Sequence, residues 1–336
     1  MRAEVLETLV TGLFERAGIP APEARAVAES LVAADMEGVP SHGVMLVPLY
    51  LERLRAGSIS KGTRAQVVHD GGGAVVLDAG HMLGQLSARQ SAALAAERAK
   101  RHGLASVAVR NGFHFGTAGY WARLIAAEGL VGIALSNTRP LMPAPGGAER
   151  VTGNNPIALA FPSPGEALVV DMAMSATAMG RIRLAEAAGK PIPEGWAADA
   201  EGRPTTDAAA AIKGMLLPAA GPKGFGLAVA IDLLCGGLSG GAIAEEVRPL
   251  YGDPAEPYGC AHFFLAIDPA AFGISDFAQR VSRMQQRIRG AKRAAGNDTI
   301  YAPGDLERAR RAANGTECPV PAQVIERLKA AERTLS

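Results

Sequence analysis

The sequence predicts an α/β protein in which a central sheet domain carries a helical layer built from both chain termini. Apolar residues recur at helical spacing through residues 1–56, and short apolar runs between glycine-rich turns then replace this pattern. From about Asp276 the chain returns to helical patterns rich in Arg, Gln and Ala. We therefore predict a helical domain made of residues 1–62 and 276–336, and an α/β domain made of residues 63–275.

The first 56 residues predict three helices. Gly18-Ile19-Pro20 ends the first helix, and the second runs from about Pro22 to Met36. Ser41 is the predicted N-cap of the third helix, which ends at Gly57. Pro48 lies inside that third pattern and therefore predicts a kink or a late start.

The middle of the chain predicts buried strands that alternate with helices. Val67–Val68 and Ala74–Leu77 read as strands on either side of the turn Asp70–Gly73. Further strands are predicted at 105–109, 131–135, 157–161, 168–170 and 263–267, and helices at 85–101, 118–127 and 224–236, the last of them buried. Prolines and glycines in 190–207 predict an ordered surface loop.

Composition excludes several classes of function. The chain of 336 residues is 48% hydrophobic and 20% charged, and it is long enough for two domains with a substantial core. Its net charge of +1 creates no field that would attract nucleic acid or an anionic membrane. No apolar run is long enough to span a bilayer, and the charged N-terminus lacks an apolar signal core, so we predict a cytoplasmic protein. The cysteines 235, 260 and 318 have no CxxC spacing, so neither a disulfide framework nor a metal site is predicted.

The segment from Asp171 to Lys190 is the most informative part of the chain. A predicted strand ends on the carboxylate of Asp171, and Ser175, Thr177 and Gly180 are predicted to open a helix. Acceptors beside the free N–H groups of a helix N-terminus suit a ligand that carries phosphate or ribose. A strand followed by Asp and a helix is also common in α/β proteins, so a purely structural interpretation stays open.

Several standard motifs of nucleotide-binding proteins and hydrolases are absent. Gly112, Gly116 and Gly119 follow a predicted strand, but their spacing is not that of the dinucleotide fingerprint G-x-G-x-x-G. The sequence also contains no P-loop, no G-x-S-x-G elbow and no H-E-x-x-H motif. A dinucleotide, if bound, would need a different kind of loop.

Three histidines and one lysine stand at informative places. His42 follows Ser41 at the start of a predicted helix, His114 lies just beyond a predicted strand, and His262 lies at the entrance to another. Each could be a proton-transfer group, although a lone loop histidine is more often structural. Lys223 lies among glycines before an apolar helix, where it can reach a phosphate or carboxylate or simply be solvated.

Taken together, ten segments resemble the malate/L-lactate dehydrogenase-like family, which includes ureidoglycolate dehydrogenase, sulfolactate dehydrogenase, diketogulonate reductase and the Δ1-piperideine-2-carboxylate reductases. The resemblance covers nearly the whole chain, with the segments in the family's order. The segments are Ser41–Val44, Asn111–Gly116, Gly153–Pro156, Asp171–Ala173, Ile192–Trp196, Pro204–Asp207, Leu216–Pro218, Pro222–Gly224, His262–Phe264 and Ala302–Asp305.

This resemblance implies an NAD(P)-dependent oxidoreductase, usually a homodimer, whose active site lies in a cleft between domains. It also implies a non-Rossmann NAD(P)-binding domain with a central mixed sheet, so that 63–275 would be the cofactor-binding and catalytic domain. His42 and Asp171 would be the acid/base pair, and His114 matches the proton acceptor of ureidoglycolate dehydrogenase-like members. The residues that would line the cofactor are Thr138, Asp171, Met172, Ala173, Ser175, Lys223, Gly224, Pro303, Gly304 and Asp305. The residues expected at the substrate are Ser41, Asn155 and Arg53, and no metal is implied.

The chain departs from the family pattern at Leu46. Many relatives have an arginine at this position, four residues after the histidine of Ser-His-Gly, where it can pair with a substrate carboxylate. Leucine cannot make this pair, so either another cation (Arg53, Arg139 or Arg181) binds the carboxylate or the substrate is held differently. Asp305 is a milder departure, because it replaces the more common glutamate.

Three functional hypotheses follow from the resemblance. The first is hydride transfer between NAD(P) and a small 2-hydroxy/2-oxo carboxylic acid. The second is reduction of a cyclic imino acid, in which His42 or Asp171 would supply a proton to the imine nitrogen. The third, from a different class, is a non-catalytic relative that binds nucleotide. The sequence leaves NAD against NADP, the substrate and the physiological direction open.

Overall fold

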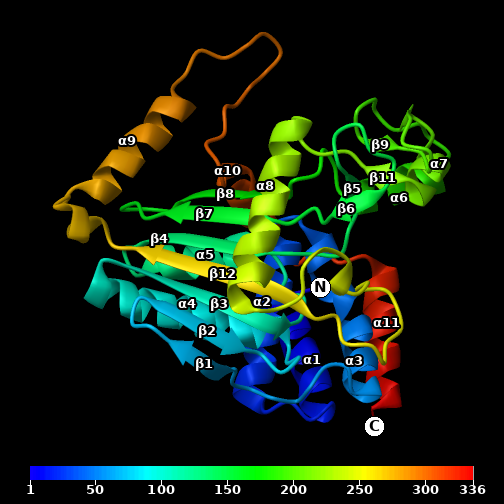
Figure 1. Cartoon of the computed structure of the whole chain (residues 1–336), viewed down its shortest axis with the longest axis horizontal. Helices are drawn as coiled ribbons and strands as arrows, with labels where there is room; N and C mark the ends of the chain where they lie inside the picture. Colours follow the sequence, from blue (N-terminus) through cyan, green and yellow to red (C-terminus); the bar gives the residue numbers. More distant parts are fainter. Residues whose placement is uncertain (336) are drawn as a thin grey trace.

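A seven-stranded mixed sheet forms the centre of the computed structural model, which describes residues 1–335 (Figure 1). Only β2 and β3 pair in parallel, and every other neighbouring pair in this sheet is antiparallel. The strand order is β1 (Gln66–Asp70), β2 (Ala74–Asp78), β3 (Leu104–Gly112), β12 (Cys260–Ile267), β4 (Val131–Ser136), β7 (Ile157–Phe161) and β8 (Leu168–Met172). The α/β class predicted from the sequence is confirmed.

Helices cover both faces of this sheet. Behind it in Figure 1, α4 (Gly84–His102) packs on β3 and β12, and α5 (Ala118–Ala127) packs on β4 and β7. On the front face, α8 (Pro222–Asp232) continues into a π-helical turn, η3 (Leu233–Gly237), which packs against β12 and β3. Burial of the strands between these helices explains why their sequences are apolar almost throughout.

Helices from the two ends of the chain lie against one another. These helices are α1 (Ala3–Arg16), α2 (Ala21–Met36), α3 (Val47–Ala56), α10 (Asp305–Asn314) and α11 (Ala322–Thr334). Helix α11 packs on α1 and α3, α10 packs on α2, and Arg16 pairs with Glu332 at 2.9 Å. Helix α9 (Phe277–Arg289) instead lies apart from them at the β7–β8 edge of the sheet (Figure 1). The division into two domains stays a prediction, and its last residue, Ser336, lies outside the described residues.

Short elements form a smaller lobe, and an apolar cluster joins this lobe (Met174, Ile182, Leu216) to α8 (Ile231) and to the central sheet (Leu135). The elements are β5 (Met142–Pro143), β6 (Arg150–Thr152), β9 (Ala197–Ala198), β10 (Pro204–Thr205), β11 (Met215–Leu216), α6 (Met179–Ala187) and α7 (Ala208–Lys213). The predicted surface loop 190–207 therefore contributes two short strands to this lobe.

Two predicted helices differ from the observed ones. The third helix starts late, at Val47, because Pro48 fits the first turn of a helix but not its interior. Two 3-10 turns precede it, η1 (Pro40–His42) and η2 (Val44–Leu46), so Ser41 is not an N-cap. The helix predicted at 224–236 is present as α8 and η3, but its predicted burial is only partly right, because Ala228, Ile231 and Cys235 are buried while Leu227 and Leu233 are 52% and 53% exposed. Apolar composition predicted burial, but only one side of this helix faces the sheet.

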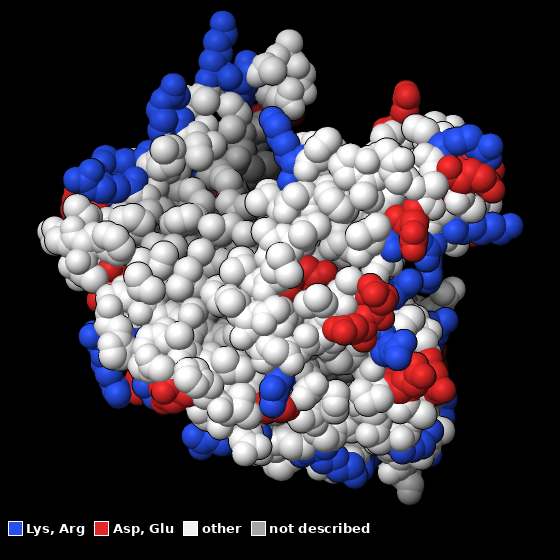
Figure 2. Space-filling view, viewed as in Figure 1, with Lys and Arg blue, Asp and Glu red and all other residues white. Residues whose placement is uncertain are grey.

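Charge is unevenly distributed over the surface. Basic residues crowd α9 and the segment after it, where no acidic residue occurs between 277 and 297 (Figure 2). The part of the surface formed by α8 is largely uncharged in the same view. Among residues 1–335, no helix combines the length and the apolar character needed to cross a membrane.

The close packing of α4 on the loop after β3 yields a test of the fold. A Cβ atom at Gly84 would lie 2.0 Å from the Phe113 carbonyl oxygen and 2.5 Å from that of His114. We expect Gly84→Ala to lower the free energy of unfolding by about 1–3 kcal/mol, because the backbone of the loop must move. Gly12→Ala is the matched control: nothing lies within 4 Å of its Cβ, so it should stabilise α1 by about 0.5–1 kcal/mol. Equal effects of the two changes in urea denaturation would contradict this packing.

Candidate active site

The turn that carries His42 is held by a buried carboxylate. Asp35, near the end of α2, accepts a hydrogen bond from the Val44 amide at 2.8 Å. Gly43 is required here, because a Cβ atom at this position would lie 2.3 Å from the Asp35 carboxylate. The Ser41 hydroxyl lies 2.9 Å from Nδ1 of His42. Burial lowers the pKa of His42 to about 4, so its imidazole is neutral at pH 7 and can accept a proton.

His114 lies beside His42 on the loop that follows β3. The two ring centroids are 5.3 Å apart, and Nδ1 of His114 lies 2.6 Å from the Tyr50 hydroxyl. Burial holds the pKa of His114 well below its ordinary value, and the neighbouring His42 and His262 lower it further. Gly116, next along this loop, faces the His42 carbonyl. Two neutral imidazoles thus meet at one place although 72 residues separate them in the sequence.

Asp171 reaches the same loop from β8. Its Oδ2 accepts a hydrogen bond from the Gly119 amide at 2.8 Å, in the first turn of α5. A Cβ atom on Gly119 would lie 2.7 Å from that oxygen, so only glycine fits. Asp171 is accessible to solvent, yet the protein atoms crowded around it raise the pKa of its carboxyl to about 6, and Gly119 and Arg123 oppose that rise. Within residues 1–335, no hydrogen bond joins Asp171 to His42, and the 113–119 loop connects them instead.

Several of the residues predicted to line a cofactor lie along β8 and in the segment directly after it. The Val169 amide donates to the Pro303 carbonyl at 3.2 Å, which places Pro303 and Gly304 beside this strand. Asp171 and Met172 are exposed at its end, and Ala173 is half-buried. Ser175 then forms a bridge with Pro218.

That bridge leads to the start of α8. The Ala219 amide donates to the Met174 carbonyl at 2.8 Å, three residues before Pro222 begins the helix. Lys223 is exposed in this first turn, and Gly224 is buried. A Cβ atom at Gly224 would lie 2.1 Å from the Ala219 carbonyl oxygen, so glycine is needed for this close approach. Thr138 is joined to the same region, because its hydroxyl lies 3.1 Å from Oδ1 of Asn154.

These residues fit a nucleotide ligand. The hydroxyl of Thr177, between Ser175 and α6, is buried and has no hydrogen-bond partner among the described residues. Buried polar atoms are rarely left unpaired, so this hydroxyl is suited to a bound group. The Lys223 ammonium and the free N–H groups at the start of α8 supply positive charge close to this segment.

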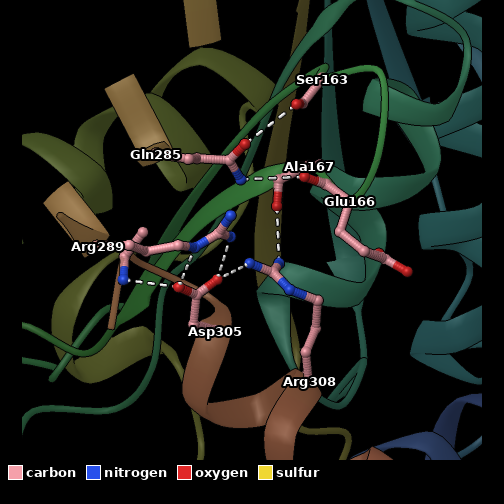
Figure 3. A network of polar contacts seen from close by, with 8 residues as sticks. Ser163, Glu166, Ala167, Gln285, Arg289, Asp305 and Arg308 are labelled. Carbon is pink, nitrogen blue, oxygen red and sulfur yellow. Dashed lines mark hydrogen bonds and ion pairs between the residues drawn. The ribbon is translucent and has the colours of Figure 1, made fainter. Parts of the chain in front are cut away.

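Asp305 occupies a different environment from the other cofactor candidates. Figure 3 shows its carboxylate between Arg289, at 2.7 and 2.8 Å, and Arg308. These arginines hold the pKa of Asp305 well below its ordinary range, Arg289 most strongly. Arg308 also donates to the Ala167 carbonyl, at the start of β8. A hollow of about 420 Å³ adjoins this network and is lined by Arg289, Arg293, Asp298, Thr299, Ile300, Tyr301 and Asp305.

Two residues expected at the substrate make hydrogen bonds inside the protein. Asn155 is fully buried: its Oδ1 accepts from the Thr138 amide, and its Nδ2 donates to the Ala228 carbonyl. Arg53 is 1% exposed, and its guanidinium donates to the carbonyls of Pro249, Leu250 and Glu256. The polar groups of both residues hydrogen-bond within the protein, and a contact of either residue with the substrate stays a prediction.

His262 is structural, because its two nitrogens lie 3.0 Å from the Ser136 hydroxyl and 3.1 Å from the Phe113 carbonyl oxygen. Within residues 1–335, no group of three or more His, Cys, Asp or Glu side chains could hold a metal ion.

Sequence reasoning missed Asp35, Tyr50 and Gln85. All three are buried and polar, and they lie in helices whose patterns are otherwise apolar or alanine-rich. A polar residue on the inner face of a helix could have identified them, since a buried polar group needs a hydrogen-bond partner. The identity of that partner is not encoded locally.

Comparison with known proteins gives this geometry a context. A sequence model described as malate/L-lactate dehydrogenase matches residues 1–329. Malate dehydrogenase from Pyrococcus horikoshii is 34% identical over 309 residues, which are 89% of this chain and 85% of that protein. The (2R)-3-sulfolactate dehydrogenase (NADP+) of Chromohalobacter salexigens is 35% identical over 325 residues, 96% of this chain and 95% of that protein. The ureidoglycolate dehydrogenase (NAD+) of Escherichia coli K12 is 34% identical over 319 residues, with coverages of 94% and 91%.

Solved structures share the whole fold. Sulfolactate dehydrogenase from Methanocaldococcus jannaschii superposes with a TM-score of 0.94 at 33% identity, covering 100% of this chain and 97% of that one. A Δ1-piperideine-2-carboxylate reductase from Pseudomonas syringae has a TM-score of 0.89 at 28% identity, covering 98% and 99%.

The buried carboxyl of Asp35 yields a test of pH dependence. Burial raises its pKa from 3.8 to about 7, so between these values the folded protein keeps a proton that the unfolded chain releases. The free energy of unfolding of the wild type should therefore fall relative to Asp35→Asn as pH rises from 4 to 7, by on the order of 2–4 kcal/mol. Asparagine keeps an oxygen for the Val44 amide. Urea denaturation at several pH values measures the difference, and a difference that does not change with pH would contradict the burial of this acid.

Proposed function

The chain belongs to the malate/L-lactate dehydrogenase family, and on that premise we propose that it transfers hydride reversibly between NAD(P) and a small 2-hydroxy/2-oxo acid. The observation that best supports this proposal is the contact between two neutral imidazoles, His42 and His114. The segment that carries His114 also donates a hydrogen bond to Asp171. Oxidation of a secondary alcohol needs a base for the hydroxyl proton, and a neutral imidazole is suited to this at pH 7.

The roles of the three site residues follow from their contacts. His114 accepts the hydroxyl proton, and His42, oriented by Ser41, hydrogen-bonds the reacting oxygen. Asp171 keeps the loop that carries His114 against β8 through the Gly119 amide. This contact makes Asp171 a positioning residue in the proposal, and its role as acid/base partner of His42 stays a prediction.

The cofactor, when bound, supplies the hydride acceptor or donor, while the protein sets the geometry. Thr138, Asp171, Met172, Ala173 and Ser175 would face its nicotinamide half. Lys223 and Gly224 would bind its phosphates, and Pro303, Gly304 and Asp305, with the adjoining hollow, its adenosine end. The relatives include one named for NADP and one named for NAD, so both must be assayed.

Arg139 is the cation best placed to bind the substrate carboxylate in the absence of an arginine at position 46. It is half-buried, and its guanidinium makes no hydrogen bond or ion pair with residues 1–335. The positive charge of Arg139 is near enough to lower the pKa of the buried Tyr258 phenol. The Tyr258 ring packs against Phe113, with centroids 5.8 Å apart, and Phe113 precedes His114 in the chain. Burial and the nearby Arg150 and Arg183 lower the pKa of Arg139, and no carboxylate compensates them. An acidic substrate would satisfy this arginine.

A second candidate is reduction of a cyclic imino acid, which the similarity to Δ1-piperideine-2-carboxylate reductase favours. The decisive experiment follows NAD(P)H oxidation, with each cofactor, on a panel of 2-oxo acids and cyclic imines. Turnover of 2-oxo acids supports the first proposal, and turnover of imines alone supports the second. Binding of the cofactor with no turnover in the panel would favour the non-catalytic alternative.

We also propose that the protein is a homodimer and that it is cytoplasmic. The exposed leucines 227, 233, 234 and 238 form an apolar stripe along α8 and η3, on a largely uncharged surface (Figure 2). A second copy of the chain would cover such a stripe. Sedimentation velocity tests the proposed homodimer, and a monomer at micromolar concentration would contradict it.

Substitutions separate the chemistry from cofactor binding. His42→Ala should lower kcat by about 100-fold or more, because loss of a hydrogen bond to the reacting oxygen in the transition state costs on that scale, while cofactor affinity stays nearly constant. Lys223→Ala should instead weaken cofactor binding about 10-fold, the loss of one charge-assisted contact. Steady-state kinetics and cofactor titration measure both effects. Near-wild-type turnover of His42→Ala would remove His42 from the mechanism.

The proposed carboxylate contact is tested with a matched pair of arginines. Arg139→Ala should raise the KM for the acid about 10- to 100-fold, because it removes a charged hydrogen bond to the substrate. Arg181→Ala, an exposed arginine of α6, is the control and should leave KM unchanged. If Arg181→Ala raised KM and Arg139→Ala did not, the assignment would be reversed.

A further inference from the structure

The hydroxyl of Tyr50 lies between His114 and a buried glutamine. The hydroxyl is 2.6 Å from Nδ1 of His114 and 3.5 Å from Nε2 of Gln85. Both Tyr50 and Gln85 are 0% exposed. Oε1 of Gln85 is buried and has no hydrogen-bond partner in the described part of the chain. A buried amide with one unpaired oxygen beside a catalytic histidine calls for an explanation.

The orientation of this amide determines which nitrogen of His114 carries the proton. In the orientation that the structure shows, Nε2 of Gln85 donates to the Tyr50 oxygen, and the Tyr50 proton points at Nδ1 of His114. The proton of the imidazole is then on its Nε2, which cannot accept another. When the amide is rotated by half a turn, its oxygen accepts the Tyr50 proton, and the Tyr50 oxygen accepts N–H from Nδ1. The Nε2 lone pair is then free to act as a base.

We propose that Tyr50 and Gln85 are positioning residues that fix the tautomer of His114, with Oε1 of Gln85 accepting the Tyr50 proton in the working enzyme. This inference rests on the proposed role of His114. The substrate proton moves to Nε2, and the Nδ1 proton stays in its hydrogen bond to Tyr50, so the resulting imidazolium is paired on that side. In the reverse direction the same imidazolium returns the Nε2 proton to the substrate oxygen.

The surroundings of Tyr50 suit this role. Its ring packs edge-on against Phe113 at 5.0 Å, which restricts the position of the hydroxyl. The hydroxyl also has a second acceptor, the His114 carbonyl at 3.4 Å, which further draws its proton away from Nδ1. The Gly116 amide, 3.4 Å from Nδ1, acts in the opposite direction because it donates to an unprotonated nitrogen. Gln85 therefore decides between two closely balanced arrangements.

The nitrogen-15 spectrum of the histidine side chains reports the tautomer without any assay of activity. The test uses the intact wild-type protein labelled with ¹⁵N-histidine, and the signals of His114 are identified by their loss in His114→Ala. We expect a protonated Nδ1 and an unprotonated Nε2 at pH 7. In Tyr50→Phe and Gln85→Leu the proton should move to Nε2, because the Gly116 amide is then the strongest influence on Nδ1.

Activity provides the second measurement. Both variants should lower kcat by about 10- to 100-fold with little change in KM or cofactor affinity, and the double variant should be no worse than the single ones. Gln85→Glu keeps an acceptor for Tyr50 and should retain the wild-type tautomer and most of the turnover.

A wild-type spectrum with the proton on Nε2 of His114 would overturn the inference, even if neither Tyr50→Phe nor Gln85→Leu folded. Unchanged tautomer and turnover in Tyr50→Phe would overturn it as well. If no 2-hydroxy acid or imine reacted, the proposed function would fail, but the spectrum would still decide the tautomer.

Discussion

The hydrogen bond from the Gly119 amide to the Asp171 carboxylate connects the two halves of the candidate site. One half is the loop after β3, which carries His114 and faces His42, and the other is β8, along which the cofactor candidates lie. This hydrogen bond joins residues that are 52 positions apart in the sequence. The first turn of α5 favours a carboxylate because its N–H groups are free, and the missing side chain of Gly119 lets the oxygen approach. Loss of this contact would remove the hydrogen bond that joins the loop after β3 to β8.

Burial gives the site its electrostatic character. It lowers the pKa of His42 to about 4 and raises that of Asp35 to about 7, and the protein atoms crowded around the solvent-accessible Asp171 raise its pKa to about 6, so each group is driven toward its neutral form. Groups perturbed in this way cluster at functional sites, because proton transfer near pH 7 requires bases that are not already protonated. The same burial demands hydrogen-bond partners, which is why Ser41, Tyr50 and Gln85 surround the imidazoles.

The glycines that fit the family pattern and the leucine that departs from it, Leu46, are explained by different physical constraints. The glycines at 43, 119 and 224 stand where a Cβ atom would collide with a carboxylate or a carbonyl, so the shape of the site constrains them. Leu46 is 2% exposed in the apolar core, where an arginine would need a partner. Arg139, three residues after β4 ends, has no ion-pair partner among residues 1–335 and carries a positive charge that a ligand could meet. In the proposed function, Arg139 would supply the charge that relatives place at position 46.

The sequence by itself determined the elements and the residues available for chemistry. Helix α5 and strand β7 have the predicted bounds, and the positions of His42, His114 and Asp171 at the ends of elements followed from apolar periodicity. Only the tertiary structure decided which helix Asp171 faces: it contacts the start of α5, and not the following helix, α6, that the sequence suggested. It also used Asn155 and Arg53 inside the protein and brought Tyr50 and Gln85 to His114. Periodicity reports whether a residue faces the core. The partner that it meets there depends on how strands distant in sequence pair, and no local pattern contains that information.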